Sequence, residues 1–429
     1  MNRSTARGNF GASSQLTGMR APSQVAAETF DRALDGFLRA SEDPVRHIQP
    51  MLVEHPDFVM GHMLVASAAI AAKHPSMLPT LRSALDAAHA NGVESTGQEG
   101  AHCMAAHAWL DGQAELAAQY YTAILREWPR DLLALRLAQS CHFFLGNRHA
   151  LRDVAELVWP AWNAGMPGYE HLLAMMAFDS AEHGDGDWAE ALGLQALAMQ
   201  PASPFAIHAV AHALSARGKF RQGALFMRQH RPNWLTDGRM VAHNMWHAAM
   251  FELESGQPAR ALKILDECLM PQAARSGSNA ADATALLWRL ELDGVDPGTR
   301  WSLLSDCWAI HASPGYWPFL DLHAAIAFSA AGHELRARSL IQGISARSRQ
   351  TGPSQDARVV TLSALRAVQA FVAGAYSEVR DIFRRLRPTL ERIGGSHAQR
   401  DLFGRMLTEA ERRLQSEKLP QSTEWGVAA

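Results

Sequence analysis

The sequence predicts an all-α fold, in which one continuous superhelix is built from repeated helix pairs. Glycine recurs at intervals of 34, 38, 34, 38, 38, 38 and 42 residues, at Gly112, Gly146, Gly184, Gly218, Gly256, Gly294, Gly332 and Gly374. Each of these glycines separates two apolar stretches that have helical periodicity. The sequence contains no alternating strand pattern and no glycine-rich phosphate-binding loop.

Each repeat is expected to be a helix–turn–helix unit. Repeats of this length that contain two helices are typical of tetratricopeptide-like arrays. A glycine between the two helices suits the left-handed residue that ends the first one. The clearest pairs are Ala206–Arg217 with Phe220–His230 across Gly218, and Met240–Glu254 with Pro258–Leu269 across Gly256. We expect a single domain over residues 26–414, a flexible N-terminal segment over 1–25 and a flexible tail over 415–429.

Composition and charge limit the class of protein. Of the 429 residues, 48% are hydrophobic and 19% are charged, so the chain can bury a large core. The formal net charge is −3 with acids and bases interspersed, which predicts no nucleic-acid partner and no membrane partner. Neither a signal-peptide core in the first 21 residues nor an apolar run of about 18 residues is present. The four cysteines are scattered without a Cys-x-x-Cys motif, so we expect reduced thiols and a cytoplasmic protein.

Two histidine pairs are the most informative feature of the chain. His208 and His212 form one pair and His243 and His247 the other, each with i,i+4 spacing. On a helix this spacing stacks both rings on one face, and it is the spacing by which a helix offers two nitrogens to one metal ion. The pairs fall on the first helices of successive repeats, which line the concave face in such arrays. Because neighbouring helices pack about 8–10 Å apart, the four rings could share one ion.

The alternative interpretation is that these four are hydrogen-bonded core histidines between alanine-rich helices. Their position in the repeat favours a common depth, since His208 lies ten residues before its glycine and His247 lies nine before its own. The sequence pattern by itself leaves both interpretations open.

Two further residues are candidates for catalysis. His323 lies nine residues before Gly332, the same offset as His247, so we expect it on the inner face of its helix. Asp282 lies on the first helix of the repeat that follows the second histidine pair, where it could add a carboxylate or orient a ring. Both are candidates for a further ligand or an acid–base group.

Three residues are candidates for substrate binding. Trp246 lies between the histidines of the second pair, although a place in the core or the wall is the alternative. A superhelix turns as it grows, so the C-terminal segment can curl back across the concave opening. Gln399 and Arg400 in that segment present donors suited to a carbonyl or an anionic edge, and Asp401 is expected to hold Arg400 in place. The alternative is that this segment caps the last helix.

Several distinctive motifs follow one another between about residue 25 and residue 415. They are His55-Pro-Asp-Phe-Val-Met-Gly-His62, Asp131-Leu-Leu-Ala-Leu135 with Phe143–Gly146, Ile207-His-Ala-Val-Ala-His212, Ala242-His-Asn-Met-Trp-His247, Leu287-Trp-Arg-Leu-Glu-Leu292 with Arg300-Trp301, Asp321-Leu-His323, and Gly394-Gly-Ser-His-Ala-Gln-Arg-Asp401. In these motifs the chain resembles the tetratricopeptide-repeat protein 38 family. The resemblance implies a tetratricopeptide-like fold but no settled activity. The chain departs from the family at His397, where Asn or Ser is usual, and at His142, where an acid is usual.

A looser resemblance links the chain to a tetratricopeptide protein of bacterial toxoflavin (azapteridine) pathways, which implies a role in specialised metabolism. With the histidine pairs, this predicts a metal-dependent enzyme that carries out redox chemistry on a small molecule. The expected cofactor is a transition metal ion, namely Fe, Co, Mn, Cu or Zn, because imidazole ligands suit these ions better than Mg or Ca. Redox chemistry would require Fe, Co, Mn or Cu. The competing hypothesis is a metal-free adaptor that holds a peptide or a partner protein in its groove.

Overall fold

The computed structural model describes residues 12–41, 43–91, 97–235, 238–347 and 355–418. Within these residues the chain is all-α except for one short antiparallel hairpin, formed by β1 (Ala12–Ser13) and β2 (Arg20–Ala21). The helices of the first half are α1 (Gln24–Arg39), α2 (Pro44–Glu54), α3 (Val59–Ala71), α4 (Leu78–Ala90), α5 (Gly97–Leu110), α6 (Ala114–Glu127), α7 (Leu132–Leu145), α8 (Arg148–Val158), α9 (Tyr169–Glu182), α10 (Gly186–Met199) and α11 (Pro204–Ala216).

The helices of the second half are α12 (Phe220–Gln229), α13 (Arg231–Trp234), α14 (Val241–Glu254), α15 (Pro258–Ile264), α16 (Met270–Ala273), α17 (Gly277–Leu292), α18 (Arg300–His311), α19 (Pro318–Ala330), α20 (Glu334–Ala346), α21 (Gln355–Val372), α22 (Tyr376–Leu386) and α23 (His397–Lys418). Short segments are η1 (Pro75–Met77), η2 (Trp159–Ala161), the π-helical η3 (Leu265–Leu269) and η4 (Leu390–Ile393). The prediction of an all-α helical array is confirmed.

The repeating glycines end the first helix of each pair. All eight adopt a left-handed backbone, with φ between 64° and 88°, which glycine reaches without the penalty of a Cβ. The pairs predicted around Gly218 and Gly256 are α11 with α12 and α14 with α15. The second helix of the latter pair extends beyond α15 through η3, where the helix widens by one π-type turn.

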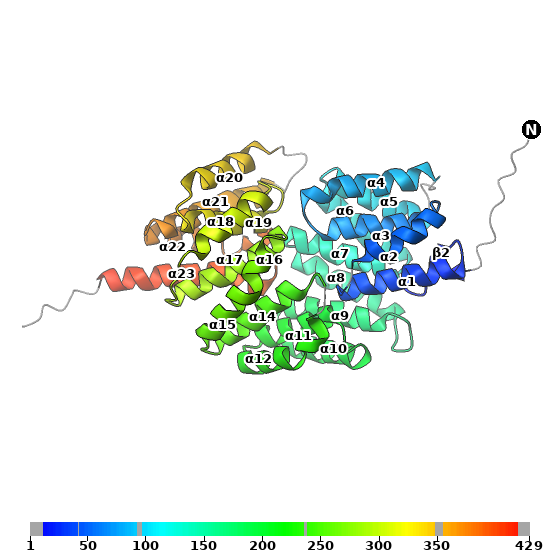
Figure 1. Cartoon of the computed structure of the whole chain (residues 1–429), viewed down its shortest axis with the longest axis horizontal. Coiled ribbons are helices and arrows are strands. Elements are labelled where there is room, and N and C mark those ends of the chain that lie inside the picture. Colours follow the sequence, from blue (N-terminus) through cyan, green and yellow to red (C-terminus); the bar gives the residue numbers. More distant parts are fainter. Residues whose placement is uncertain (1–11, 42, 92–96, 236–237, 348–354, 419–429) are drawn as a thin grey trace, which may run out of the picture.

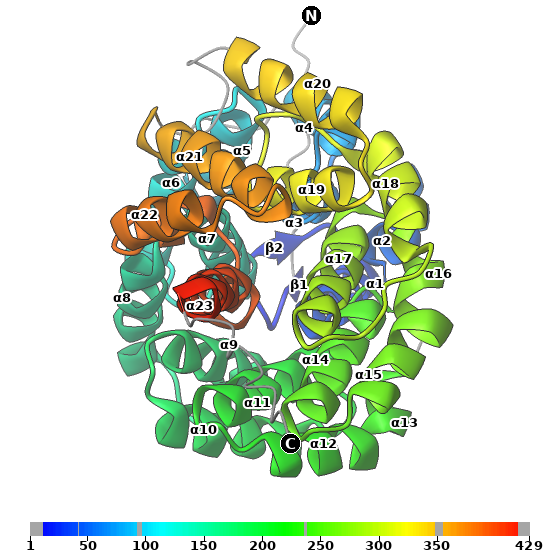
Figure 2. The same ribbon diagram turned by 90° about the vertical axis from the view of Figure 1, so that its left-hand side faces the viewer.

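The helix pairs wind into a superhelix whose first helices face inward. Figure 2 shows α7, α9, α11, α14, α17 and α19 on the inner side of α8, α10, α12, α15, α18 and α20. Successive inner helices pack against each other, as α9 does against α11 and α14 against α17. Figure 1 shows the N-terminal helices α1–α7 at one end of the molecule and α17–α22 at the other.

The two ends of the array touch, so the superhelix closes into a ring. Nε2 of His74 lies 3.2 Å from the carbonyl oxygen of His311, although the two residues are 237 positions apart. Phe144 at the end of α7 stacks on Trp317 before α19, with ring centroids 5.5 Å apart.

The C-terminal helix α23 lies inside this ring, where Figure 2 shows it nearly end-on. It packs against α17 and α11 as well as against α22. Arg289 of α17 donates a hydrogen bond to the carbonyl oxygen of Ala398 at 2.8 Å, and Arg405 of α23 forms an ion pair with Glu254 of α14. The C-terminal segment therefore curls back across the concave side, as the superhelical turn predicts.

The ends of the domain differ from the expected boundaries. Residues 12–21 belong to the segment expected to be flexible, but they form the hairpin, with Leu16 buried and the Ser14 hydroxyl donating to Asp31 of α1 at 2.5 Å. At the other end α23 continues to Lys418, so the first four residues of the expected tail are helical. The remaining residues of the two expected flexible segments, 1–11 and 419–429, lie outside the described residues.

Nearly all buried hydrophobic side chains belong to one cluster, which extends from Ala12 to Ala410. The described part of the chain therefore has one continuous hydrophobic core. In the part of the chain that the structure describes, no helix is both long enough and apolar enough to cross a membrane.

Gly146 tests the closure of the ring. A Cβ on Gly146 would lie 1.7 Å from the carbonyl oxygen of Glu391 in η4, whereas a Cβ on Gly256 would meet no atom within 4 Å. Alanine in a left-handed conformation is unfavourable by about 1–2 kcal/mol, so Gly256→Ala should lower the free energy of unfolding by that amount. Gly146→Ala should lower it by about 2–5 kcal/mol, because α7 and η4 must also move apart. Urea denaturation followed by circular dichroism measures both, and equal losses would contradict the close approach of α7 to η4.

Candidate metal centre

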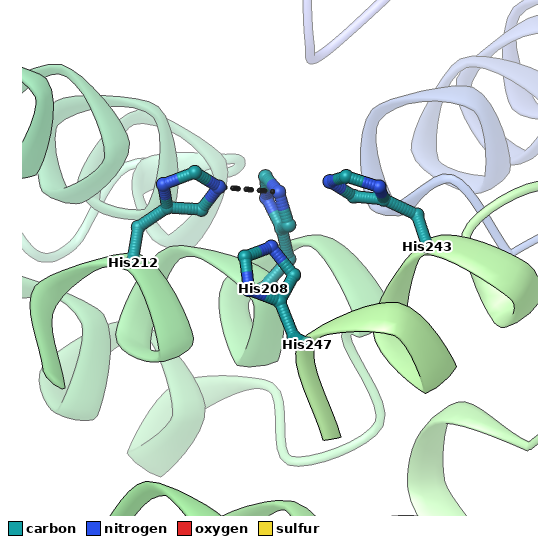
Figure 3. Close-up of side chains that lie close together, drawn as sticks. All are labelled: His208, His212, His243 and His247. Carbon is teal, nitrogen blue, oxygen red and sulfur yellow. Dashed lines mark hydrogen bonds between the residues drawn. The ribbon is translucent and has the colours of Figure 1, made fainter. Parts of the chain in front are cut away.

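Four imidazole rings converge on the inner faces of α11 and α14 (Figure 3). α11 starts after Ser203, whose hydroxyl caps the helix, and one face of it carries His208 and His212 one turn apart. His243 and His247 have the same relation on α14, which packs against α11. One ring nitrogen from each of the four lies within 4.8 Å of the others. The Nε2 atoms of His208 and His212 are 2.9 Å apart.

Three of the four rings are buried, which disfavours the charged form of their imidazoles. Only 6% of His208, 3% of His212 and 2% of His247 is exposed, whereas the His243 side chain is 19% exposed. Burial lowers the pKa of His212, and it lowers the pKa of His208 and of His247 well below the usual value. The neighbouring imidazoles act in the same direction, because protonating one ring would place its charge beside the next. Neutral imidazole is the form that binds a metal ion.

Two carboxylates hold rings of the cluster from behind. The oxygens of Asp282 on α17 lie 3.0 and 3.1 Å from Nδ1 of His243. Oε1 of Glu182 on α9 lies 3.2 Å from Nδ1 of His212. A carboxylate that accepts the Nδ1–H proton leaves Nε2 as the nitrogen with a free lone pair, which is the arrangement found behind metal-bound histidines.

Glu182 connects the cluster to the start of α23. Its Oε2 accepts the backbone N–H of His397 at 2.7 Å and lies 3.9 Å from Nη2 of Arg400. Burial raises the pKa of this carboxyl, but the bonds and charges of His212 and Arg400 outweigh burial and lower the pKa overall. Our sequence prediction missed Glu182. Its only signal is an acid at the end of a mostly apolar inner helix, in the repeat before the one that carries the first histidine pair.

The spacing and the unpaired atoms of the cluster fit a metal ion. Two ligands about 2.0–2.1 Å from one ion lie roughly 2.9–3.4 Å apart for ligand angles between about 90° and the tetrahedral value. The Nε2 atoms of His208 and His212 fall in this range. Nε2 of His247 is buried and has no hydrogen-bond partner among the described residues, which a bound ion would correct. The four histidines could therefore hold a metal ion, and their nitrogen donors suit a transition metal.

Trp246 forms part of the wall of the cluster. It is fully buried, its indole is nearly parallel to the His243 ring at 5.4 Å, and it contacts the edge of His247 at 4.8 Å. It also borders, with His247, a cleft of about 240 Å³ between α11, α14 and α23. Trp246 therefore lies in the wall, which is the alternative that the sequence analysis gave for it. Its predicted contact with a substrate stays a prediction.

The structure places the two candidate catalytic residues differently. Asp282 accepts a hydrogen bond from Nδ1 of His243 and is not one of the four residues whose nitrogens converge, so its role is to orient the His243 ring. His323 is fully buried, and its Nδ1–H donates to the carbonyl oxygen of Phe319 at 2.7 Å. Burial lowers the pKa of His323 to about 4, against the opposing effects of the Phe319 carbonyl and the charge of Asp282. His323 contributes no atom to the four-nitrogen group, and its catalytic role stays a prediction.

The predicted substrate-binding residues on α23 serve mainly to fix the start of that helix. Oε1 of Gln399 accepts the N–H of Ser396 at 2.9 Å, while the Ser396 hydroxyl accepts the N–H of Gln399 at 3.2 Å, which is a capping box. Arg400 donates to the carbonyl oxygen of Gly395 and faces Glu182. The expectation that Asp401 holds Arg400 is wrong, because Asp401 instead accepts from Arg405 one turn later, at 2.9 Å.

A second group with metal-binding residue types consists of Asp35, Glu170 and His171. Asp35 already forms an ion pair with Arg39 and accepts a hydrogen bond from His171 at 2.9 Å, so its charge is compensated within the protein. The geometry therefore favours the four-histidine cluster over this second group as a metal site.

No protein-family model matches the chain.

The capping box predicts a structural effect without a metal effect. Ser396→Ala should lower the free energy of unfolding by about 0.5–2 kcal/mol, because the Gln399 N–H at the start of α23 loses its acceptor. Thermal unfolding of the purified variant measures the loss. Metal analysis of the same sample should match wild type, and a Ser396→Thr variant, which keeps the hydroxyl, should recover most of the stability. Full stability of Ser396→Ala would contradict the cap.

Proposed function

We propose that the protein binds one transition metal ion through His208, His212, His243 and His247 and is a metal-dependent enzyme that acts on a small molecule. The observation that carries this proposal is the convergence of four buried imidazole nitrogens within 4.8 Å of one another. Nε2 of His247 is buried and has no hydrogen-bond partner among the described residues, so its lone pair is free to bind an ion.

The ligand set determines which chemistry the ion can supply. Four neutral imidazoles leave the charge of a divalent ion uncompensated in its first shell, so the ion stays a strong Lewis acid, and Fe, Co, Mn or Cu would add redox chemistry. Asp282 and Glu182 hold protons at Nδ1 of His243 and His212 and keep both rings oriented. Trp246 excludes water from one side of the cluster. His243 is the most exposed of the four rings, so we assign substrate approach to its side.

The position of α23 favours the enzyme over the peptide-binding adaptor. An adaptor of this architecture would use the concave face as its groove, but the N-terminal half of α23 packs against α17 and α11 on that face (Figure 2). The cleft that borders His247 has a volume of about 240 Å³, which is too small for an extended peptide.

We further infer that the array is of the tetratricopeptide type and that the chain belongs to the tetratricopeptide-repeat protein 38 family. The regular helix pairs and the ordered motifs of the sequence support this. The looser resemblance to the toxoflavin-pathway protein supports redox chemistry in specialised metabolism, on a substrate of the azapteridine type.

The metal content of the untagged protein tests the proposal. We expect about one ion per chain in protein purified without an affinity tag, measured by inductively coupled plasma mass spectrometry. His208→Gln with His247→Gln should abolish metal retention and preserve the helical circular dichroism spectrum. The matched control is His89→Gln with His107→Gln, a pair of histidines whose rings lie 4.9 Å apart outside the cluster, and it should keep the metal. Wild type without metal, after growth with each candidate ion, would contradict the proposal.

The carboxylates behind the rings provide a graded test. Glu182→Gln and Asp282→Asn should each weaken metal affinity by about 10- to 100-fold, because an uncharged amide accepts the Nδ1–H bond more weakly than a carboxylate and no longer balances the charge of the ion. Competition with a chelator of known affinity measures the change. Asp401→Asn removes a carboxylate that pairs with Arg405 instead of with a histidine, so its affinity should equal that of wild type. Equal affinity in all three variants would mean that the carboxylates do not support the ligands.

A further inference from the structure

Three cationic side chains from distant parts of the chain gather near the histidine cluster. Lys73 follows α3, Arg136 lies on α7 and Arg239 precedes α14. They are close enough to repel one another. Burial and the charge of Arg136 and Arg239 lower the pKa of Lys73 to about 7, and burial and the charge of Arg239 lower the pKa of Arg136 to about 10. Like charges brought together in a folded protein are unfavourable unless something compensates them.

No described carboxylate forms an ion pair with any of the three. The Arg136 guanidinium donates to the neutral amide of Gln139 at 3.0 Å, and its buried Nε has no partner among the described residues. Lys73 Nζ reaches only the carbonyl oxygen of Ala71, at 3.4 Å. Asp179 acts on Arg136, but burial raises the pKa of Asp179 well above the usual value, which favours its neutral form. Asp43 acts on Arg239 and opposes the effect of burial on its pKa. Three cations therefore face a single charged carboxylate, which leaves the group with a net positive charge.

The cations are connected to the metal site through aromatic rings. The Arg136 guanidinium lies 4.4 Å from the centroid of Phe205, and Phe205 contacts His208 at 5.8 Å. Lys73 lies over Phe143 at 5.5 Å. A ligand at the cations would therefore be next to the His208 end of the cluster.

The backbone at Lys73 adds an independent observation. Its φ is +50°, in the left-handed region where glycine is favoured, and among the described residues only Ala40 shares this feature outside glycine. Lys73 closely follows α3, so the left-handed turn that ends this helix fixes the point from which the lysine side chain starts.

We propose that Lys73, Arg136 and Arg239 form an oxyanion-binding subsite, which holds a carboxylate or phosphate group of the small-molecule ligand beside His208. Arginine offers paired donors that match the oxygens of either group, and lysine adds a point charge. That the anion belongs to a substrate rests on the proposed function, whereas anion binding itself does not require the metal.

Binding of simple anions to the full-length, metal-free protein tests the subsite. Inorganic phosphate and acetate are titrated separately by calorimetry at low ionic strength and pH 6.5, where Lys73 is charged. We expect one anion per wild-type chain, and binding at least about tenfold weaker in Arg136→Gln with Arg239→Gln. The matched control is Arg152→Gln with Arg260→Gln, which removes two exposed guanidiniums elsewhere and should bind as wild type does. Tighter binding of phosphate assigns a phosphoryl group, and tighter binding of acetate assigns a carboxylate.

Two results would overturn the subsite: no binding of either anion by wild type, or equal binding by the two double variants. If the Arg136 variant does not fold, Arg239→Gln alone replaces it, because the Arg239 side chain is exposed. In anion-free buffer Arg239→Gln should not lower the melting temperature, and a drop would assign a structural role and contradict the proposal. Metal content is measured on the same samples. Anion binding without metal binding would support the subsite while contradicting the metal-dependent function, so the two failures are distinguishable.

Discussion

The close packing of α11 against α14 is the constraint on which the candidate centre depends. An i,i+4 histidine pair on one helix provides two nitrogens on one face, which is half of a site. The second half comes from the neighbouring inner helix, and only because the repeat places it at the same depth. Buried alanines such as Ala209 and Ala249 leave the room for this approach, since larger side chains would separate the helices. The repeat geometry thus determines the distance between the pairs.

Charged side chains surround the histidine cluster, with acids on one side of the rings and cations on another. Burial and the neighbouring rings lower the pKa of His208 and of His247, which favours their neutral form. Acids lie behind them, with Asp282 on His243 and Glu182 on His212, where they balance part of the charge of a bound ion. Cations lie beyond His208, where they would meet an anionic ligand. Helix α23 completes the arrangement, because the backbone N–H of His397 donates to Glu182 and so connects the C-terminal helix to the histidine cluster.

Features repeated along the sequence could be predicted, whereas features made by contacts between distant segments could not. The glycine period predicts the helix pairs because a left-handed residue must end each first helix. The i,i+4 spacing predicts which rings share a face. Glu182 could not be predicted, since its role comes from contacts with His212 and with the start of α23, 215 positions later. Lys73, Arg136 and Arg239 likewise share no local motif.

Two contacts that the sequence analysis missed could have been recognised from the spacing of their residues. Ser396 and Gln399 have the spacing of a capping box, and Asp401 and Arg405 have the spacing of a helical ion pair, so both partnerships were present in the sequence. The hairpin of residues 12–21 had no such signal, because its strands have two residues each and depend on α1 for burial.

X-ray absorption at the metal edge of the untagged protein tests the central claim most directly, because it reports both the presence of an ion and the identity of its ligands. The account predicts a first shell of nitrogen or oxygen ligands at about 2.0–2.1 Å for zinc, with the multiple scattering of several imidazole rings. This signal should disappear in the variant that lacks His208 and His247. A bound metal without imidazole scattering, or with scattering that survives this double substitution, would contradict the four-histidine centre.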